Sequence, residues 1–185
     1  MDFSKHFDLV GQHAFLSASS YHWINYTEDK LDEVFFRSEA AKRGTELHAY
    51  AHMAIRLKQR QAANGKTVNT YVNDALGYRM ASEQIVYFSR NAFGTADTIQ
   101  FSRNKLRIHD LKTGVFPASV HQLEVYAALF CLEYRMKPFD IEIELRIYQN
   151  DEVLIYEGDP TTIVTIMDRI VSFDRRIEEL RMEVE

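Results

Sequence analysis

The sequence predicts an α/β (α+β) protein in which helices pack on a central mixed sheet, and three observations predict this class. Residues 1–82 are mainly helical in pattern, residues 83–158 are rich in β-forming residues around one helical stretch at 117–136, and residues 160–184 return to helical spacing. Strands and helices in this order form a sheet that is covered by helices. No linker or repeat interrupts the chain, so we expect a single domain over 1–185.

The N-terminal part predicts three helices. The stretch LSASSYHWIN, residues 16–25, has serines at its start that can cap free backbone amides. A longer helical segment runs from about residue 28 to residue 61, with an expected break near Arg43-Gly44-Thr45, and Asn64-Gly65 ends it by turn chemistry. A short third helix is expected over 68–80.

The middle of the chain predicts an antiparallel meander of three strands. Residues 84–88 and 93–101 are rich in β-branched and aromatic side chains and are separated by a turn centred on Asn91. Residues 102–105 then form a hairpin turn that leads into the third strand, LRIHDLK, at 106–112.

The rest of the chain predicts one helix, two strands and a final helix. Residues 117–136 have helical spacing, whereas 139–148 alternate between apolar and charged side chains, as in a half-buried strand. Residues 153–156 form another short strand. Asp159-Pro160 is a good cap and first position for the last helix.

Composition and charge exclude several classes of protein. A single cysteine, Cys131, excludes a disulfide framework, a cysteine-rich zinc site and a four-cysteine iron–sulfur cluster. The formal charge of −5 argues against a general nucleic-acid coat protein. No apolar run approaches the roughly 18 residues of a membrane span, and the N-terminus lacks the apolar stretch of a secretory signal. We expect a cytoplasmic protein with no membrane partner.

The strongest chemical signal is a pair of aspartates on neighbouring predicted strands. Asp110 and Lys112 lie two residues apart in one strand and share a face, while His109 and Leu111 point to the other face. Asp97 lies on the preceding strand of the same hairpin, so the two carboxylates are expected side by side. Paired carboxylates repel each other unless a cation such as Mg²⁺ or Mn²⁺ neutralises them. The alternative is an ordinary Asp–Lys pair on a solvated face.

Four motifs in a fixed order resemble the PD-(D/E)xK nuclease superfamily, in its RecB-like branch that includes phage exonucleases. They are Leu-Ser-Ala-Ser-Ser at 16–20, Arg-Gly-Thr-Glu-Leu-His at 43–48, the Gly94-Thr-Ala-Asp97 and His109-Asp-Leu-Lys-Thr-Gly114 pair of strand motifs, and Gln122-Leu-Glu-Val-Tyr126. Each motif alone is weak, but their shared order makes a stronger signal. The resemblance covers roughly residues 16–146 and implies a restriction-endonuclease-like core.

The resemblance also implies a site for Mg²⁺ or Mn²⁺. His48, Asp97 and Asp110 take the places of the metal ligands, with the backbone carbonyl of Leu111 as a fourth, and Lys112 takes the place of the catalytic lysine. The two aspartates would thus be catalytic as well as ligating.

The remaining implied site residues contact the substrate. Gln122 and Tyr126 match an element that orients the site and contacts DNA. The cysteine quartet of the iron–sulfur members is missing, so no such cluster is expected. The helicase module of many relatives is missing too, so a helicase or strand-annealing partner would be a separate protein in a bacterial or phage-infected cell.

Several of these residues have a simpler structural interpretation. Ser119-Val-His-Gln122 fits a capping box, in which Gln122 would serve the helix start alone, and Tyr126 fits the edge of the core. His52 is expected to be an ordinary helix residue. Thr95 and Thr113 are expected to serve packing. Four further residues are expected to flank the site without being ligands: His109, His121, Glu46 and Glu83.

The expected function is metal-dependent hydrolysis of DNA. The rival interpretation is a nuclease-like fold used as a non-catalytic binding or interaction subunit. Finally, an apolar stripe from Ile163 to Val184 at spacings of three and four predicts that the last helix packs on its own domain, with an intermolecular seam and a homo-oligomer as the alternative.

Overall fold

The computed structural model describes residues 6–114 and 117–184 and divides the chain into two compact units, Met1–Arg43 and Gly44–Glu185. The first unit contains the short 3₁₀ helices Phe7–Leu9 and Ala18–Asn25 and the first part of helix α1 (Glu28–Arg56). The second contains the rest of α1 and all of the sheet. The single domain expected over 1–185 stays a prediction.

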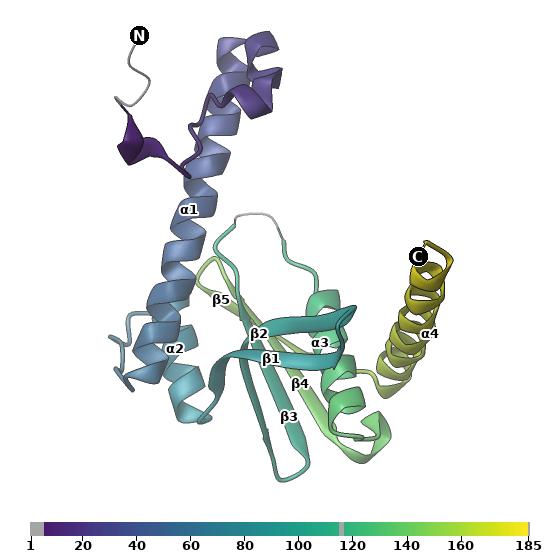
Figure 1. The fold of residues 1–185 in the computed structure, drawn as a ribbon. Helices are drawn as coiled ribbons and strands as arrows, with labels where there is room; N and C mark the ends of the chain where they lie inside the picture. The colour runs from purple at the N-terminus through teal and green to yellow at the C-terminus, as the bar shows by residue number, and fades with distance from the viewer. Residues whose placement is uncertain (1–5, 115–116, 185) are drawn as a thin grey trace. The chain divides into compact units, whose positions relative to one another are not determined.

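The second unit is an α+β fold built on a five-stranded mixed sheet, as Figure 1 shows. Its strands follow the chain in the order β1 (Ala81–Ser89), β2 (Ala92–Ser102), β3 (Lys105–Leu111), β4 (Glu142–Gln149) and β5 (Glu152–Glu157). Only the β3–β4 pair is parallel; the other three neighbouring pairs are antiparallel. The predicted meander and the central mixed sheet with flanking helices are confirmed.

Helix α3 (His121–Glu133) forms the crossover between the two parallel strands and covers one face of the sheet. Its buried Leu123 and Ala127 pack with Leu106 and Ile108 of β3. Ile163 of α4 (Pro160–Val184) joins the same cluster. Helix α3 is shorter than the stretch 117–136 that the helical spacing of the sequence predicts.

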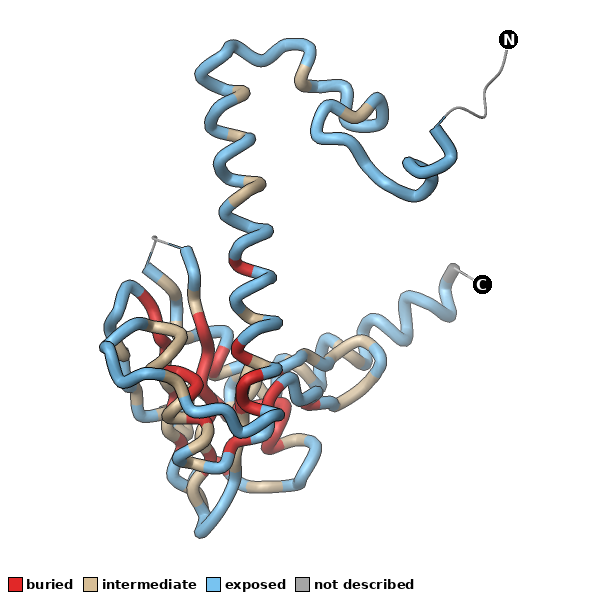
Figure 2. Tube along the Cα trace, turned by 90° about the vertical axis from the view of Figure 1, so that its left-hand side faces the viewer, coloured by how far each residue is buried: buried red, intermediate tan, exposed pale blue. Residues whose placement is uncertain are grey.

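The other face of the sheet is covered by the end of α1 and by α2 (Thr67–Gly77). Ala51 of α1 and Val72 of α2 are buried there with Leu111 and Tyr148 of the sheet. Figure 2 shows the buried residues gathered in the strands and in the helical segments that pack on them. Because β3 alternates its side chains between two covered faces, its residues from Ile108 to Leu111 are buried, whereas Lys105 and Arg107 are partly exposed.

The expected break in the first long helix is wrong. α1 runs without interruption through Arg43-Gly44-Thr45 and ends at Arg56 rather than near residue 61. A Cβ atom at Gly44 would lie 2.8 Å from Thr113 Oγ1, so the glycine allows a close approach of helix and strand end. The segment expected as a helix over 16–25 is a 3₁₀ helix, Ala18–Asn25, whose cap is Ser17.

Turn and cap chemistry confirm other predictions. Arg103 and Asn104 both have positive φ, as the tight hairpin between β2 and β3 requires. Asp159 accepts hydrogen bonds from the backbone N–H groups of Thr161 and Thr162 at the start of α4. Among the described residues, no helix is both long enough and apolar enough to span a bilayer.

The apolar stripe of α4 is divided between two environments. Ile163 is fully buried, and Ile166 and Ile170 pack on the α3 side of the sheet. Further along, Phe173 and Ile177 are 62% and 38% exposed. The first half of the stripe therefore belongs to the core of its own domain, while the homo-oligomer suggested by the second half stays a prediction.

Candidate metal centre

Asp97, in the middle of β2, lies opposite Asp110, near the end of β3. The register pairs Thr98 with His109, and one further step along both strands places Asp97 opposite Asp110. The backbone N–H of Leu111 donates to Asp97 Oδ2 over 2.9 Å, which ties the end of β3 to this carboxylate. The sequence prediction that the two aspartates lie side by side is consistent with this register.

Asp110 is a buried carboxylate, with only 3% of the residue exposed. Burial raises its pKa to about 6, and the negative charge of Asp97 adds to the rise, while Lys112 opposes it. Lys112 Nζ lies 3.1 Å from Asp110 Oδ2, but this contact lacks hydrogen-bond geometry, so the oxygen is buried without a hydrogen-bond donor. The alternative of a solvated surface Asp–Lys pair is therefore wrong.

His48 reaches this pair of strands from α1. Its Nδ1 atom lies 3.4 Å from Asp97 Oδ2, and the interaction with Asp97 raises the pKa of the imidazole against the opposing effect of burial. His48 and Asp97, which are 49 residues apart in the sequence, thus meet as the sequence predicts, one from a helix and the other from a strand.

A third acid joins this pair more closely than expected. In the described part of the chain, His48, Glu83 and Asp97 each offer a ligand atom within 4.8 Å of the others. From its sequence position Glu83 is expected only to flank the site, because it belongs to none of the motifs. Glu83 lies in β1 with a φ of 52°, a left-handed conformation that a non-glycine residue seldom adopts.

Lys112 is held by a chain of side-chain hydrogen bonds. Its Nζ atom donates to Gln122 Oε1 over 2.8 Å, and Gln122 Nε2 donates to Tyr126 OH over 3.0 Å. The ring of Tyr126 lies over Gly94, where a Cβ atom would come within 2.7 Å of Tyr126 Cε1. The hydrogen-bonded chain therefore joins two of the predicted motifs, those of Lys112 and of Gln122 and Tyr126, and the motif that begins at Gly94 packs against Tyr126.

The capping-box interpretation of Gln122 is wrong. The N-cap of α3 is Val120, and Ser119 Oγ accepts from the backbone N–H of His121 rather than from that of Gln122. Tyr126 packs at the edge of the core, as the structural interpretation predicts, and its hydroxyl also accepts a hydrogen bond from Gln122.

Three other histidines, His52, His109 and His121, have structural partners. From the sequence His109 is expected to flank the site, but it is fully buried on the opposite face, where its Nδ1 lies 3.2 Å from Tyr148 OH. His121 is paired with Glu124 over 2.7 Å, and His52 Nδ1 lies 2.9 Å from Ser82 Oγ.

The donor set fits a hard divalent cation. His48, Glu83 and Asp97 bring an imidazole and two carboxylates within 4.8 Å of one another, whereas Asp110 is not part of this group. Asp110 lies opposite Asp97 in the strand register and has one oxygen that lacks a hydrogen-bond donor. Oxygen ligands with one nitrogen suit Mg²⁺ or Mn²⁺. A cation would also remove the repulsion that raises the pKa of Asp110.

Comparisons with known proteins leave the family open. No protein-family model matches the chain, and no curated protein matches it either. Among solved structures there is a likeness to the one titled "Crystal structure of SSO0001", with 16% sequence identity over 82% of this chain and 68% of that one. Its TM-score of 0.35 is too low to support an argument about fold or function.

Proposed function

We propose that this chain is a metal-dependent deoxyribonuclease with a restriction-endonuclease-like core, similar to the RecB-like branch of the PD-(D/E)xK superfamily. The observation that carries the proposal is the buried Asp110 carboxylate, which has an unpartnered oxygen and lies 3.1 Å from Lys112. A buried carboxylate is expensive in a purely structural role, because the ion pair with Lys112 repays its desolvation penalty only in part and one of its oxygens lacks a hydrogen-bond donor.

The metal ligands in this proposal are His48, Asp97 and Asp110 with the Leu111 carbonyl, and Glu83 is an additional candidate from its position. When bound there, Mg²⁺ or Mn²⁺ would lower the pKa of a water molecule and neutralise charge on the scissile phosphate. The hydrogen bond from the Leu111 N–H holds Asp97 in place, so its carboxylate is oriented before any ligand arrives.

The chain's own contribution to hydrolysis rests on Lys112. Its ammonium group is positioned between Asp110 and Gln122, where it can donate a hydrogen bond to the attacking water or to a phosphate oxygen. Gln122 and Tyr126 restrict the lysine to this position and present polar atoms at the exposed side of the site, where DNA would bind.

The second candidate function is a nuclease-like module that binds DNA or another protein without cutting. The organised Lys112–Gln122–Tyr126 chain favours catalysis, because simple binding does not require a lysine to be held against a buried carboxylate. Within the catalytic proposal, similarity to phage exonucleases favours processing of DNA ends in recombination or replication, together with a separate helicase or strand-annealing protein.

A cleavage assay tests the proposal directly. The protein is incubated with end-labelled linear duplex, covalently closed circular duplex and single-stranded DNA, in Mn²⁺, in Mg²⁺ and in EDTA, beside the Asp110→Asn variant. We expect degradation of linear DNA with either metal and none in EDTA or with the variant. Cutting of the closed circle would identify an endonuclease instead. Binding to DNA with no cleavage in either metal would favour the non-catalytic module.

A further inference from the structure

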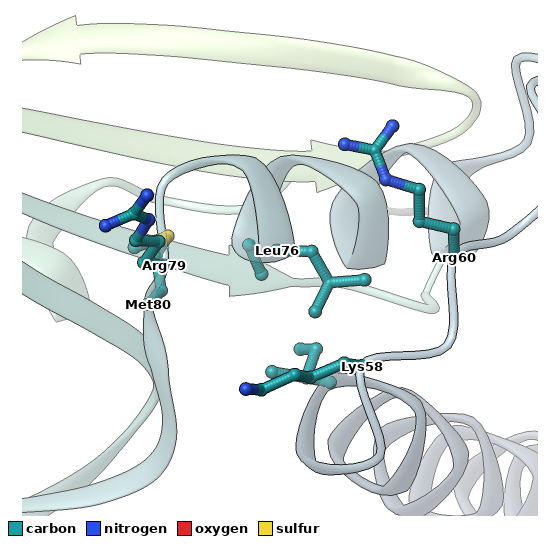
Figure 3. A pocket seen from close by; sticks show the side chains of 7 residues that line it. Lys58, Arg60, Leu76, Arg79 and Met80 are labelled. Carbon is teal, nitrogen blue, oxygen red and sulfur yellow. The ribbon is translucent and has the colours of Figure 1, made fainter.

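A hollow of about 460 Å³ lies where α1 and α2 end, away from the candidate metal centre. Its floor is apolar and consists of Ile55, Ala75, Leu76 and Met80. Three cations complete the lining, and Figure 3 shows them around Leu76: Lys58, Arg60 and Arg79.

Two of the cations owe their positions to the way the helices end. Lys58 N–H donates to Ile55 O and Gln59 N–H to Ala54 O, which is the Schellman pattern at the end of α1. α2 ends in the same way, with Arg79 N–H bonded to Leu76 O and Met80 N–H to Ala75 O. Lys58 and Arg79 therefore have φ values of 53° and 56°, at the position where glycine is preferred.

This conformation is not peculiar to the hollow. α3 also ends in a Schellman motif, with Arg135 at a φ of 54°, and Arg135 does not line the hollow. The positive φ of Lys58 and Arg79 therefore does not distinguish this hollow from another helix end. What distinguishes Lys58 and Arg79 is that two helix ends bring them to one concave surface together with Arg60.

The hollow is positively charged in a chain with a net charge of −5. Within residues 6–114 and 117–184, neither Lys58, Arg60 nor Arg79 forms an ion pair, and no acidic side chain lines the hollow. The two helix C-termini contribute about −0.5 charge each, which leaves roughly two positive charges uncompensated.

An adjoining hollow of about 520 Å³ shares Arg79 with the first and is also lined by Arg103, Lys105 and Arg107. Lys105 is ion-paired with Glu142 and Glu144, and Arg107 with Glu144, so Arg79 and Arg103 are the cations of this lining that have no ion pair among the described residues. Two hollows that share a cation suit a ligand with several phosphates in a row better than a single small anion. Because the three cations of the first hollow are exposed, their contacts would be electrostatic and independent of base sequence.

We propose that Lys58, Arg60 and Arg79 bind backbone phosphates of the DNA whose scissile bond lies at the candidate metal centre. This inference rests on the proposed function. The same helix carries both regions: from His48 to the end of α1 at Arg56 the rise is about 12 Å, which corresponds to three or four base pairs of B-DNA at about 3.4 Å each. The apolar floor receives the sugar face of the backbone beside the bound phosphates.

The test uses glycine substitutions that relieve the backbone while removing the charge. The single variants Lys58→Gly and Arg79→Gly are compared with Arg135→Gly, the matched control with the same helix-end geometry outside the hollow. Binding of a labelled duplex oligonucleotide is measured in EDTA, where no cleavage occurs, over a series of KCl concentrations. Thermal unfolding of each variant is measured in parallel.

We expect Lys58→Gly and Arg79→Gly each to reduce the slope of log Kd against log salt by about one, with the melting temperature unchanged or raised. The control should keep the wild-type slope. Losses of slope no larger than in Arg135→Gly would overturn the proposal. Competition by adenosine monophosphate that displaces the duplex at low micromolar concentration would overturn it too, since it would identify a mononucleotide pocket.

The readout separates this inference from the nuclease proposal. If the protein binds DNA through these residues but never cuts it, the phosphate contact stands and the proposed catalysis fails. If the protein cuts DNA and the slopes are unaffected, the nuclease proposal stands and the contact fails.

Discussion

The carboxylate of Asp97 accepts a hydrogen bond from the backbone N–H of Leu111 over 2.9 Å, and this contact ties the middle of β2 to the end of β3. The strand register places Asp97 opposite the second acid of the candidate site, Asp110, and two such carboxylates repel each other in the absence of a cation.

Asp110→Asn is expected to abolish Mn²⁺ binding in calorimetry. In EDTA its melting temperature should be unchanged or higher, because the carboxylate has a pKa raised to about 6 and is therefore destabilising in its ionised form at neutral pH. Wild-type Mn²⁺ affinity in the variant would remove Asp110 from the ligand set. Glu83→Gln, tested beside it, decides whether the third acid ligates the metal.

Lys112→Ala is expected to lower the single-turnover cleavage rate by roughly 10²- to 10⁴-fold, with little change in DNA affinity. Lys112→Arg should not restore the rate, since a planar guanidinium cannot take the place of a compact ammonium between Asp110 and Gln122. If DNA affinity falls and the single-turnover rate does not, Lys112 is a phosphate anchor.

Gly94→Ala is expected to slow cleavage by about tenfold while the protein still folds. The new methyl group would lie 2.7 Å from Tyr126 Cε1, so the ring must shift and the bond from Gln122 to Tyr126 weakens. Gly77→Ala is the control, because nothing lies within 4 Å of its Cβ position. Equal rates in the two variants would show that the chain from Tyr126 to Lys112 does not position the lysine.

The burial of His109 leads us to expect that the stability of the fold depends on pH. Burial, reinforced by the positive charge of Arg146, lowers the pKa of its imidazole to about 3, whereas the unfolded chain titrates near 6.5. Between these values the unfolded state binds more protons, so stability should fall as the pH falls from about 6.5 towards 3.

The measurement is thermal unfolding in EDTA from pH 4 to pH 7, with Asp110→Asn as the background. This background removes an opposing effect, because a carboxyl with a raised pKa makes the folded protein more stable as pH falls through about 6. His109→Gln in the same background should show a shallower pH dependence. Identical curves would mean that folding does not shift the pKa of His109, which would contradict the prediction.

The exposed half of α4 yields a prediction about assembly. Truncation before Asp159 should unfold or aggregate the chain, because it removes the buried Ile163 and its neighbours from the core. Ile177→Asp leaves that core intact and changes only the exposed stripe. A smaller molar mass in light scattering for Ile177→Asp than for the wild type would establish the intermolecular seam, and an unchanged mass would rule it out.

The order of the helices and strands follows from local patterns in the sequence. Alternation in β3 was enough to place Asp110 and Lys112 on one face and His109 on the other, because the two-residue period of a strand is a local property. The hairpin turn at Arg103-Asn104 and the cap at Asp159 were equally local.

The tertiary structure decided what depends on partners that are distant in the chain. The residue type of Gly44 suggests a helix break, but the fold places Thr113 against it, where a glycine is needed for the close approach. His109 lies in a motif near the site, but the fold buries it beside Tyr148. Glu83 carries no motif and joins His48 and Asp97 only through the fold. The positive hollow likewise exists only because two helices end at the same place, a long-range coincidence of packing that no local pattern encodes.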